Sequence, residues 1–229
     1  MKYRAVLLDA DDTVADFHAA EEKALKILFD RLGFTMEEAA DDYKRINKAC
    51  WAAYEKGEMT QPELRKARFD GFLKLHPSDM SACDAALFYE TALSRQTDLL
   101  PGALEAVKAI SEKMPIAIVT NGIASIQRPR MEKSPLRPYI SEVVISEEVG
   151  ASKPRPEMLY AALERLGGLS AKDVLMIGDS LTSDMGAAKN AGIDFLWYNP
   201  KGKARPQDAH ITYETDNISD FAVYALQEE

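Results

Sequence analysis

Four short apolar segments divide the chain, and each of them ends in polar or charged residues. They cover residues 4–8, 116–120, 143–146 and 174–178. Apolar runs of this length are typical of strands that are buried on both faces of a parallel sheet. Between these runs, apolar residues recur with helical spacing, as at Leu104, Val107 and Ile110. Strands that alternate with helices predict an α/β fold, in which right-handed crossovers join the strands of a parallel sheet.

The segment from residue 15 to residue 98 is different, because only helical patterns occur in it. Four helices are predicted there, with boundaries marked by Gly33, Gly57, Thr60 and Ser78. Thr60 and Glu63 have the spacing of a capping box, which satisfies free backbone groups at the start of a helix. We therefore expect a core domain of residues 1–14 and 99–229, with a helical cap domain of residues 15–98 inserted after the first strand.

The composition favours a soluble protein of the cytoplasm. Its 229 residues suffice for one core with a sizeable insertion. No stretch of about 18 apolar residues is present that would span a bilayer. The first residues run directly into an acidic segment and lack the features of a signal peptide. Cys50 and Cys83 stand inside helical patterns without CxxC spacing, so we expect small buried side chains and no disulfide framework.

The net charge of −9 argues against nucleic-acid binding, because a phosphate backbone is bound by clustered Lys and Arg residues. We expect neither a nucleic acid duplex nor a membrane as a partner. A small phosphate monoester is compatible with this charge, since a divalent cation and one or two basic groups reverse the local field.

The first candidate site directly follows the strand at residues 4–8. Asp9 and Asp11 are two positions apart, and the alternation of side chains along a strand sends both to the same side. Two carboxylates at a strand end suit a hard cation such as Mg²⁺, which prefers oxygen ligands and takes some of them from a substrate phosphate. Taken alone, the same acids also fit a solvated turn.

Two further candidates follow the second and third strands. Thr120, Asn121 and Gly122 supply a hydroxyl and free backbone N–H groups that can hold phosphoryl oxygens, although Asn-Gly is also a common turn dipeptide. Lys153 comes after the third strand and a polar loop. An inward ammonium would counter the repulsion between a carboxylate nucleophile and a phosphate, whereas most single lysines are solvated.

The fourth candidate lies after the strand at residues 174–178. Asp179 suits a cation, whereas Asp184 suits either a metal site or the start of the following helix. All four candidates come just after a strand, and the carboxyl ends of the strands in a parallel sheet line one crevice. Their common placement predicts a single site.

The ordered motifs DxDxT, strand-Thr, Lys-Pro and GDxxxxD resemble the four signatures of the haloacid dehalogenase superfamily, and they run from Asp9 to Asp184. The resemblance implies a Rossmann-like core with an inserted helical cap of the C1 type, which closes over the substrate. It also implies a Mg²⁺-dependent hydrolase of small phosphomonoesters.

The resemblance further implies the roles of the residues that handle the phosphoryl group. Asp9 would attack phosphorus to give an aspartyl-phosphate, while Asp11 would protonate the leaving alkoxide and then activate water. Thr120 and the backbone amide of Asn121 would hold the transferring phosphoryl group.

The metal ligands implied by the resemblance come from the first and fourth motifs. Mg²⁺ would be held by Asp9, the backbone carbonyl of Asp11 and Asp179. Asp184 would either ligate through water or orient Lys153.

A closer resemblance is to the bacterial house-cleaning pyrimidine 5′-nucleotidases. It is carried by residues 47–51, 57, 68–69, 120–122 and 145–150. The implied substrates are nucleoside monophosphates such as dUMP, dTMP and modified or damaged pyrimidine analogues.

Four residues of the predicted cap are candidates for contacts with such a substrate. Asn47 places an amide on an otherwise apolar helical face, where it suits a base edge. Trp51 and Tyr54 have the spacing either to stack on a nucleobase or to fill the cap core. Arg68 suits the phosphate or sugar, and equally a snorkelling surface arginine.

Several other functions share these motifs. Dehalogenases lack the second acid of the first motif, so Asp11 favours phosphoryl chemistry over carbon–halogen cleavage. A sugar-phosphate phosphatase and a phosphomutase of the β-phosphoglucomutase type are the alternatives to a nucleotidase. A non-catalytic phospho-receiver also gathers acids, a Thr and a Lys at strand ends, but its acceptor Asp follows the third strand. The chain is expected to be a monomer or a homodimer.

Overall fold

The chain folds into two compact units. The structure is a computed structural model, and it describes residues 1–228. The larger unit consists of Met1–Phe17 together with Thr97–Glu229, and the smaller unit is His18–Gln96.

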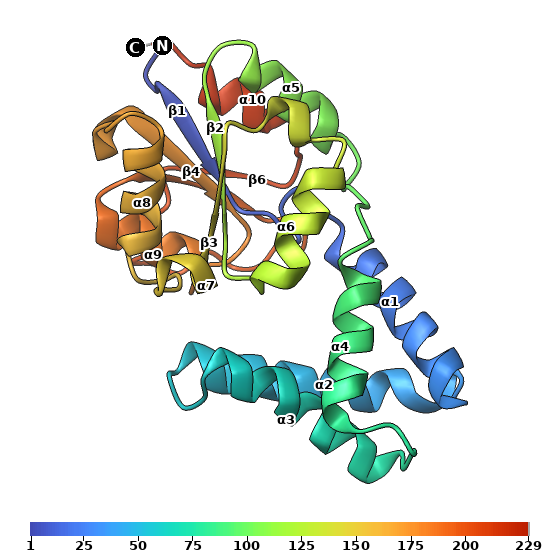
Figure 1. Cartoon of the computed structure of the whole chain (residues 1–229). Helices are drawn as coiled ribbons and strands as arrows, with labels where there is room; N and C mark the ends of the chain where they lie inside the picture. The colour runs from blue at the N-terminus through green and yellow to red at the C-terminus, as the bar shows by residue number, and fades with distance from the viewer. Residues whose placement is uncertain (229) are drawn as a thin grey trace. The chain divides into compact units, whose positions relative to one another are not determined.

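A six-stranded parallel sheet forms the centre of the larger unit (Figure 1). Its strands are β1 (Ala5–Leu8), β2 (Ile116–Thr120), β3 (Glu142–Ile145), β4 (Val174–Gly178), β5 (Asp194–Tyr198) and β6 (Tyr213–Thr215). They lie in the order β3-β2-β1-β4-β5-β6, which is that of a Rossmann-type sheet. The predicted α/β class is confirmed, and the four predicted strands are confirmed to within one residue. The strands β5 and β6 are additional to the prediction.

Helices cover both faces of the sheet (Figure 1). One face carries α5 (Ala103–Ser111), α6 (Ala124–Lys133) and α10 (Asp220–Ala225), and the other carries α8 (Glu157–Arg165) and α9 (Asp184–Ala191). Side chains of β1 pack against the helices on both faces. Val6 and Leu8 belong to the cluster with α5, α6 and α10, and Ala5 and Leu7 belong to the cluster with α8 and α9. This alternation follows the period of two along a strand and explains why the whole strand is apolar.

Short elements connect these layers. They are α7 (Ser146–Val149) and two turns of 3₁₀ helix, η1 (Arg137–Tyr139) and η2 (Ala171–Asp173). The turns that follow β1, β2 and β4 carry the predicted polar motifs.

Within its described residues, the smaller unit contains helices and no strand. They are α1 (Phe17–Leu32), α2 (Met36–Glu55), α3 (Gln61–Leu75) and α4 (Ala82–Leu93). The capping box at Thr60 is confirmed, since its side chain and that of Glu63 each bond to the backbone of the other residue. A second capping box begins α2 at Thr35, and Ser81 is the N-cap of α4.

Stacked and tilted aromatic rings form the core of the smaller unit. Neighbouring centroids lie 5.3–6.4 Å apart among the fully buried rings of Phe29, Tyr43, Phe69, Phe72 and Tyr89. Cys50 is buried, whereas Cys83 is exposed. The expectation of two buried cysteines is therefore wrong for Cys83, which lies on the solvent side of α4.

The segments that lead into and out of the helices α1–α4 lie side by side. Ala15 and Leu99 form an antiparallel bridge. The backbone N–H of Leu100 donates to the carbonyl of Val14 at 2.9 Å. The chain therefore leaves the sheet and returns to it through one short paired junction.

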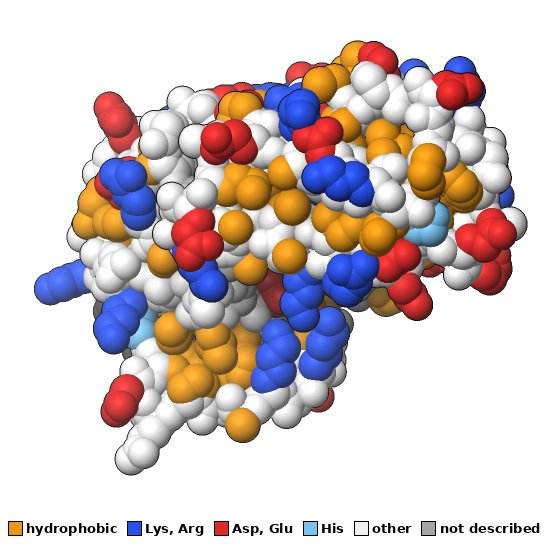
Figure 2. Space-filling model, turned by 90° about the horizontal axis from the view of Figure 1, so that it is seen from below, with side chains coloured by type: hydrophobic (Ala, Val, Ile, Leu, Met, Phe, Trp, Pro, Cys, Tyr) orange, Lys and Arg blue, Asp and Glu red, His pale blue; other side chains and the backbone are white. Residues whose placement is uncertain are grey.

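The surface mixes charged and apolar side chains. Acidic and basic residues are interspersed with apolar ones on the face shown in Figure 2. The most exposed large apolar residues are Met1, Ile27, Leu75, Leu87, Tyr160 and Val223, which come from different elements. None of the described helices combines the length and the hydropathy needed to cross a bilayer.

Candidate active site

Lys153 is a buried cation that joins the ends of β1 and β2 to the start of α9. Its Nζ donates to Oδ1 of Asp9 and to Oδ1 of Asp184, at 2.6 Å in each case, and to the carbonyl of Val119 at 2.7 Å. These bonds use all three donors of the ammonium. The side chain is 1% exposed, so Lys153 lies inside the protein and not in solvent.

The two carboxylates keep this lysine charged. Burial alone would lower the pKa of Lys153, but Asp184 and Asp9 raise it above its ordinary value. A permanent positive charge therefore lies beside both acids.

Asp9 is held at the end of β1 by its backbone and by its side chain. Its N–H donates to the carbonyl of Ile177 in β4 at 2.9 Å. Its Oδ2 accepts from the hydroxyl of Thr13 at 3.0 Å, and Oδ1 accepts from Lys153. Asp12 has a φ of 62°, a left-handed conformation that Asp tolerates better than most residues. The resulting turn brings Thr13 back to Asp9.

Asp9, Asp179 and Asp184 form a compact group of carboxylates. Each offers one oxygen, and these oxygens lie within 4.8 Å of one another. Asp179 follows β4, and its carbonyl accepts from Nε1 of the buried Trp197 at 3.0 Å. Trp197 was not predicted to support the site, because its apolar run in β5 gives no sign of a polar contact.

The acids of this group repel one another. Burial, together with the charges of Asp184 and Asp12, raises the pKa of Asp179 to about 7. Burial and Asp184 also raise the pKa of Asp9, while Lys153 opposes that rise. When all three are ionised, these carboxylates outnumber the buried ammonium of Lys153, so the group carries excess negative charge. The oxygen donors, their spacing and this charge fit a hard divalent cation such as Mg²⁺.

Asp184 is the first residue of α9 and is 1% exposed. Its Oδ2 accepts from the N–H of Ser180 at 3.1 Å, while Oδ1 accepts from Lys153. The close approach of β4 depends on Gly178, because a Cβ atom there would lie 2.3 Å from Oδ2 of Asp184. Asp184 therefore combines a place in the first turn of α9 with orientation of the lysine.

Asn121 fixes the backbone of Lys153. Its Nδ2 donates to the Lys153 carbonyl, and its Oδ1 accepts from the Lys153 N–H, each at 2.8 Å. Nδ2 also lies 3.3 Å from Oγ of Ser183. The sequence pointed to the backbone amide of Asn121 and gave no sign of this side-chain role, since the direction of the side chain depends on the turn after β2.

Thr120 and Asp11 are linked through helix α6. Nε2 of Gln127 lies 2.6 Å from Oδ2 of Asp11 and 3.3 Å from Oγ1 of Thr120. Nη1 of Arg130 donates to Oδ1 of Asp11 at 2.6 Å. Asp11 thus turns to α6 and lies outside the carboxylate group around Lys153. Gln127 and Arg130 were not predicted. Their spacing of three positions in the segment after Thr120 is the one sequence feature that could have indicated them.

Two of the predicted cap residues are buried within the smaller unit. Asn47 is 8% exposed, and its Nδ2 donates to Oε1 of Glu21 at 3.2 Å. Arg68 is 2% exposed, and its Nη2 donates to Oε1 of Glu90 at 3.3 Å. Their contact with a substrate stays a prediction.

The other two predicted cap residues form a partly exposed aromatic pair. The ring centroids of Trp51 and Tyr54 lie 5.7 Å apart, with an interplanar angle of 82°. Both rings belong to α2, one turn apart. Stacking of a nucleobase on either ring also stays a prediction.

Comparison with known proteins places these features in a family. The model of the haloacid dehalogenase-like hydrolases matches residues 3–192. Over 96% of this chain, it is 35% identical to the pyrimidine 5′-nucleotidase PynA of Streptococcus pneumoniae, with 94% of that protein covered. It is 31% identical to the pyrimidine 5′-nucleotidase YjjG of Escherichia coli, over 96% of this chain and 97% of that protein.

A solved structure shows the same similarity in three dimensions. The structure of YfnB from Bacillus subtilis bound to magnesium superposes with a TM-score of 0.90 at 32% sequence identity. The match covers 99% of this chain and all of the YfnB chain.

Proposed function

The chain belongs to the haloacid dehalogenase-like hydrolases, and we propose on this basis that it hydrolyses pyrimidine nucleoside monophosphates with Mg²⁺ and an aspartyl-phosphate intermediate. Within that family it is a phosphatase, as its similarity to two nucleotidases indicates. The choice of nucleotide, the cation and the intermediate are the proposed parts.

The contact that carries the proposal is the salt bridge from Lys153 to both Asp9 and Asp184. A carboxylate attacks a phosphate only if the repulsion between two anions is reduced. The ammonium of Lys153 supplies a fixed positive charge at that point in a buried setting, where its field is weakly screened.

The carboxylate group supports Mg²⁺ as the cofactor. Asp9, Asp179 and Asp184 would hold the ion directly or through water, and the backbone carbonyl of Asp11 is the further proposed ligand. When bound, Mg²⁺ would neutralise the facing carboxylates and withdraw charge from the phosphoryl oxygens. The structure of YfnB bound to magnesium supports this choice.

In the first half of the proposed reaction, a carboxylate oxygen of Asp9 attacks phosphorus. A P–O bond to Asp9 forms while the P–O bond to the nucleoside breaks. The proton of a neutral Asp11 passes to the leaving oxygen, which departs as an alcohol and leaves Asp11 as a carboxylate. The hydroxyl of Thr120 and the N–H of Asn121 hold the phosphoryl oxygens.

In the second half, water attacks phosphorus of the aspartyl-phosphate. Asp11 takes a proton from this water, so the acid of the first step becomes the base of the second. The P–O bond to Asp9 breaks, which releases inorganic phosphate and restores the carboxylate of Asp9. Both Asp9 and Asp11 then return to their starting protonation states.

Residues of the smaller unit are proposed to recognise the base. Oδ1 of Asn47 is buried and accepts no hydrogen bond from the described residues. Such an acceptor suits the ring N–H of uracil or thymine. Trp51 and Tyr54 supply aromatic faces for stacking, and we propose a phosphate or sugar contact for Arg68.

The proposed location is the cytoplasm. Cys50 and Cys83 are both free thiols, which fits a reducing compartment.

The test is phosphate release from a panel of nucleoside monophosphates and sugar phosphates, with Mg²⁺ and with EDTA. Metal-dependent release with preference for pyrimidine deoxynucleotides is expected. Preference for sugar phosphates would overturn the proposed substrate class, and undiminished release in EDTA would overturn the proposed cofactor.

A further inference from the structure

Helix α6 presents two buried polar side chains to Asp11. Gln127 is 2% exposed and Arg130 is 1% exposed. They lie three positions apart on α6, and Nη1 of Arg130 also donates to Oε1 of Gln127 at 3.2 Å. Each reaches a different oxygen of the Asp11 carboxylate, at 2.6 Å in both cases.

We propose that Gln127 and Arg130 are positioning residues, which fix the carboxyl group of Asp11 for proton transfer. The proposal rests on the acid and base roles of Asp11 in the proposed function. Each carboxylate oxygen has two lone-pair sites, and one on each oxygen is used by α6. The remaining sites can carry a proton while the side chain stays in one orientation.

Gln127 extends this control to Thr120. The two hydrogens of its Nε2 serve Oδ2 of Asp11 and Oγ1 of Thr120. Oγ1 also accepts from the N–H of Gly122 at 3.1 Å, so both acceptor sites of this hydroxyl are occupied. Its own O–H must then donate elsewhere, as a group that holds a phosphoryl oxygen needs to do. One amide therefore orients both the carboxyl group of Asp11 and the hydroxyl of Thr120, which would donate a hydrogen bond to a phosphoryl oxygen.

The backbone makes room for this amide. A Cβ atom at Gly122 would lie 2.4 Å from both Cγ and Nε2 of Gln127. The position of the Gln127 side chain, and not a left-handed backbone conformation, therefore favours glycine at position 122.

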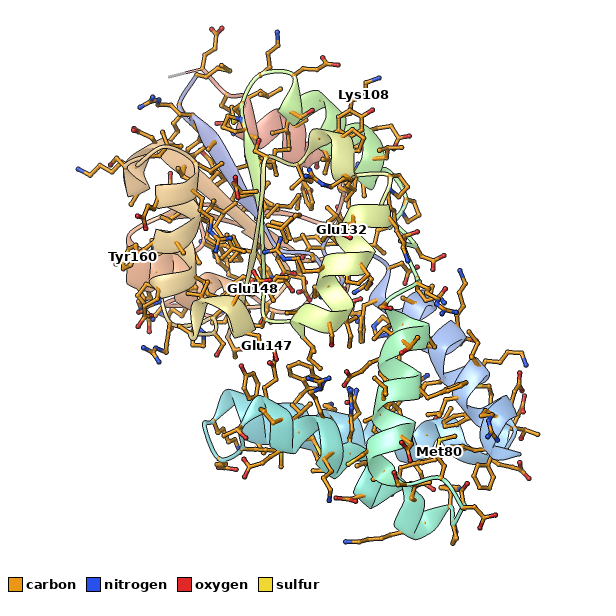
Figure 3. All side chains as sticks on the ribbon, in the orientation of Figure 1. Met80, Lys108, Glu132, Glu147, Glu148 and Tyr160 are labelled. Carbon is orange, nitrogen blue, oxygen red and sulfur yellow. The ribbon has the colours of Figure 1, made fainter. Side chains whose placement is uncertain are left out.

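Neighbouring elements make further contacts with α6. Oε2 of Glu147 accepts from the N–H of Ala124 at 2.7 Å, at the start of α6. Oε1 of Glu148 accepts from Nε of Arg128 at 2.7 Å. Figure 3 shows both glutamates on α7, beside α6. The guanidinium of Arg130 lies 6.0 Å from the ring centroid of Phe17, within the range of a cation–π contact.

Dependence on the leaving group separates this role from a general structural one. A nucleoside alkoxide leaves poorly and needs the proton of Asp11, whereas p-nitrophenolate leaves without one. The kcat/KM value reports steps up to departure of this group, so it is insensitive to the later attack of water. Loss of positioning should therefore lower kcat/KM for a nucleotide far more than for p-nitrophenyl phosphate.

The experiment compares dUMP with p-nitrophenyl phosphate in the full-length wild type, Arg130→Met, Arg130→Lys and Gln127→Met. For Arg130→Met, kcat/KM for dUMP is expected to fall on the order of 100-fold and that for p-nitrophenyl phosphate by less than about fivefold. Arg130→Lys keeps a positive charge and a hydrogen-bond donor, so it should lose less of the dUMP activity than Arg130→Met. Gln127→Met also loses the bond to Thr120, so both substrates should decline, with dUMP declining more.

Arg128→Met is the matched control, because Arg128 lies on the same helix and pairs with Glu148 instead of Asp11. It should leave the ratio of the two kcat/KM values unchanged. Equal losses for both substrates in the folded Arg130 and Gln127 variants, or no loss in either, would overturn the proposal. If Arg130→Met does not fold, the ratio in Gln127→Met decides.

Failure of the proposed nucleotidase function would appear differently. The wild type would then release no phosphate from dUMP, and the comparison would use the alkyl phosphomonoester that it does hydrolyse.

Discussion

The Nζ atom of Lys153 lies 2.6 Å from Oδ1 of Asp9, although the two residues are 144 positions apart in the chain. The same ammonium reaches Asp184 on α9. It therefore determines how strongly these acids repel each other, and how strongly Asp9 repels an incoming phosphate.

Replacement of this lysine should impair both catalysis and folding. Lys153→Met is expected to lower kcat on the order of 10²–10³-fold, as loss of a preorganised charge does in other enzymes. It should lower the free energy of unfolding by roughly 3–5 kcal/mol at pH 8, because two buried carboxylates lose their partner. Phosphate release and urea unfolding would measure the two effects.

The loss of stability should shrink as the pH falls. Burial and Asp184 already raise the pKa of Asp9, and removal of the ammonium would raise it further. A carboxyl whose pKa is higher in the folded than in the unfolded protein binds protons preferentially when folded, so acid stabilises the variant. The exposed pair of Lys26 and Asp30 provides the control, since Lys26→Met should change stability little at either pH. An equal loss at pH 5 and pH 8 would contradict this account.

Asp9→Asn should abolish turnover and preserve the fold. The amide keeps the shape of the side chain and removes a charge from a crowded group of acids. Without Mg²⁺, the Tm of the variant should therefore equal or exceed that of the wild type. Phosphate release and thermal unfolding test the two halves of this prediction, and substantial residual turnover would rule out Asp9 as the nucleophile.

Magnesium affinity should depend on pH through Asp179. Burial and nearby acids raise the pKa of this carboxyl to about 7, so below that pH a proton must leave before the ion binds. The Kd for Mg²⁺ is expected to be about tenfold weaker at pH 6 than at pH 8. Calorimetric titration would measure it, and Asp179→Asn should bind weakly with a smaller dependence on pH. A Kd that is constant between these pH values would argue against Asp179 as a ligand.

Gly178→Ala should disturb the site from the end of β4. The added Cβ would lie 2.3 Å from the Asp184 carboxylate, which must move away from Lys153. We expect a loss of roughly 1–3 kcal/mol in the free energy of unfolding together with a lower kcat. Gly71→Ala is the control, because its Cβ would meet only the flexible side chain of Ile46 at 3.1 Å. Similar kinetic losses in both variants would count against a specific role for Gly178.

Trp51→Ala tests the proposed base recognition. The side chain is partly exposed, so its removal should change the Tm little. If the ring stacks on a pyrimidine, KM for dUMP should rise roughly fivefold or more, on the scale of about 1 kcal/mol for a lost aromatic contact. KM for p-nitrophenyl phosphate should change less, and an equal change for both substrates would contradict stacking on the base.

The regular features of the site were predictable because a parallel sheet places the carboxyl ends of its strands at one edge. From that rule alone, Lys153 can be predicted to lie near Asp9, without any knowledge of side-chain packing. The rule does not predict the contacts of Gln127 and Arg130, because the direction of their side chains depends on how α6 is rotated against the sheet. The pairing of Asn121 with the Lys153 backbone depends likewise on the local turn.

The pattern of apolar residues also did not predict the strands β5 and β6 at one edge of the sheet. The strand β6 has only three residues, Tyr213–Thr215, and two of them are partly exposed. Such a short, partly polar segment has no recognisable period. The strand β5 is a clear apolar run at Asp194–Tyr198, but no polar motif follows it, so the strand-end pattern that predicts the site does not include it.

The bridge between Ala15 and Leu99 pairs the two chain segments that connect helices α1 to α4 to the sheet. Since both ends of this helical segment meet there, a replacement of any length needs only two ends that lie side by side. On the proposal that this segment recognises the nucleotide, insertions or substitutions between these points would alter substrate choice without changing the register of the strands that lead to Asp9, Thr120 and Asp179. The residues that hydrolyse the substrate and those that select it would then change independently of each other.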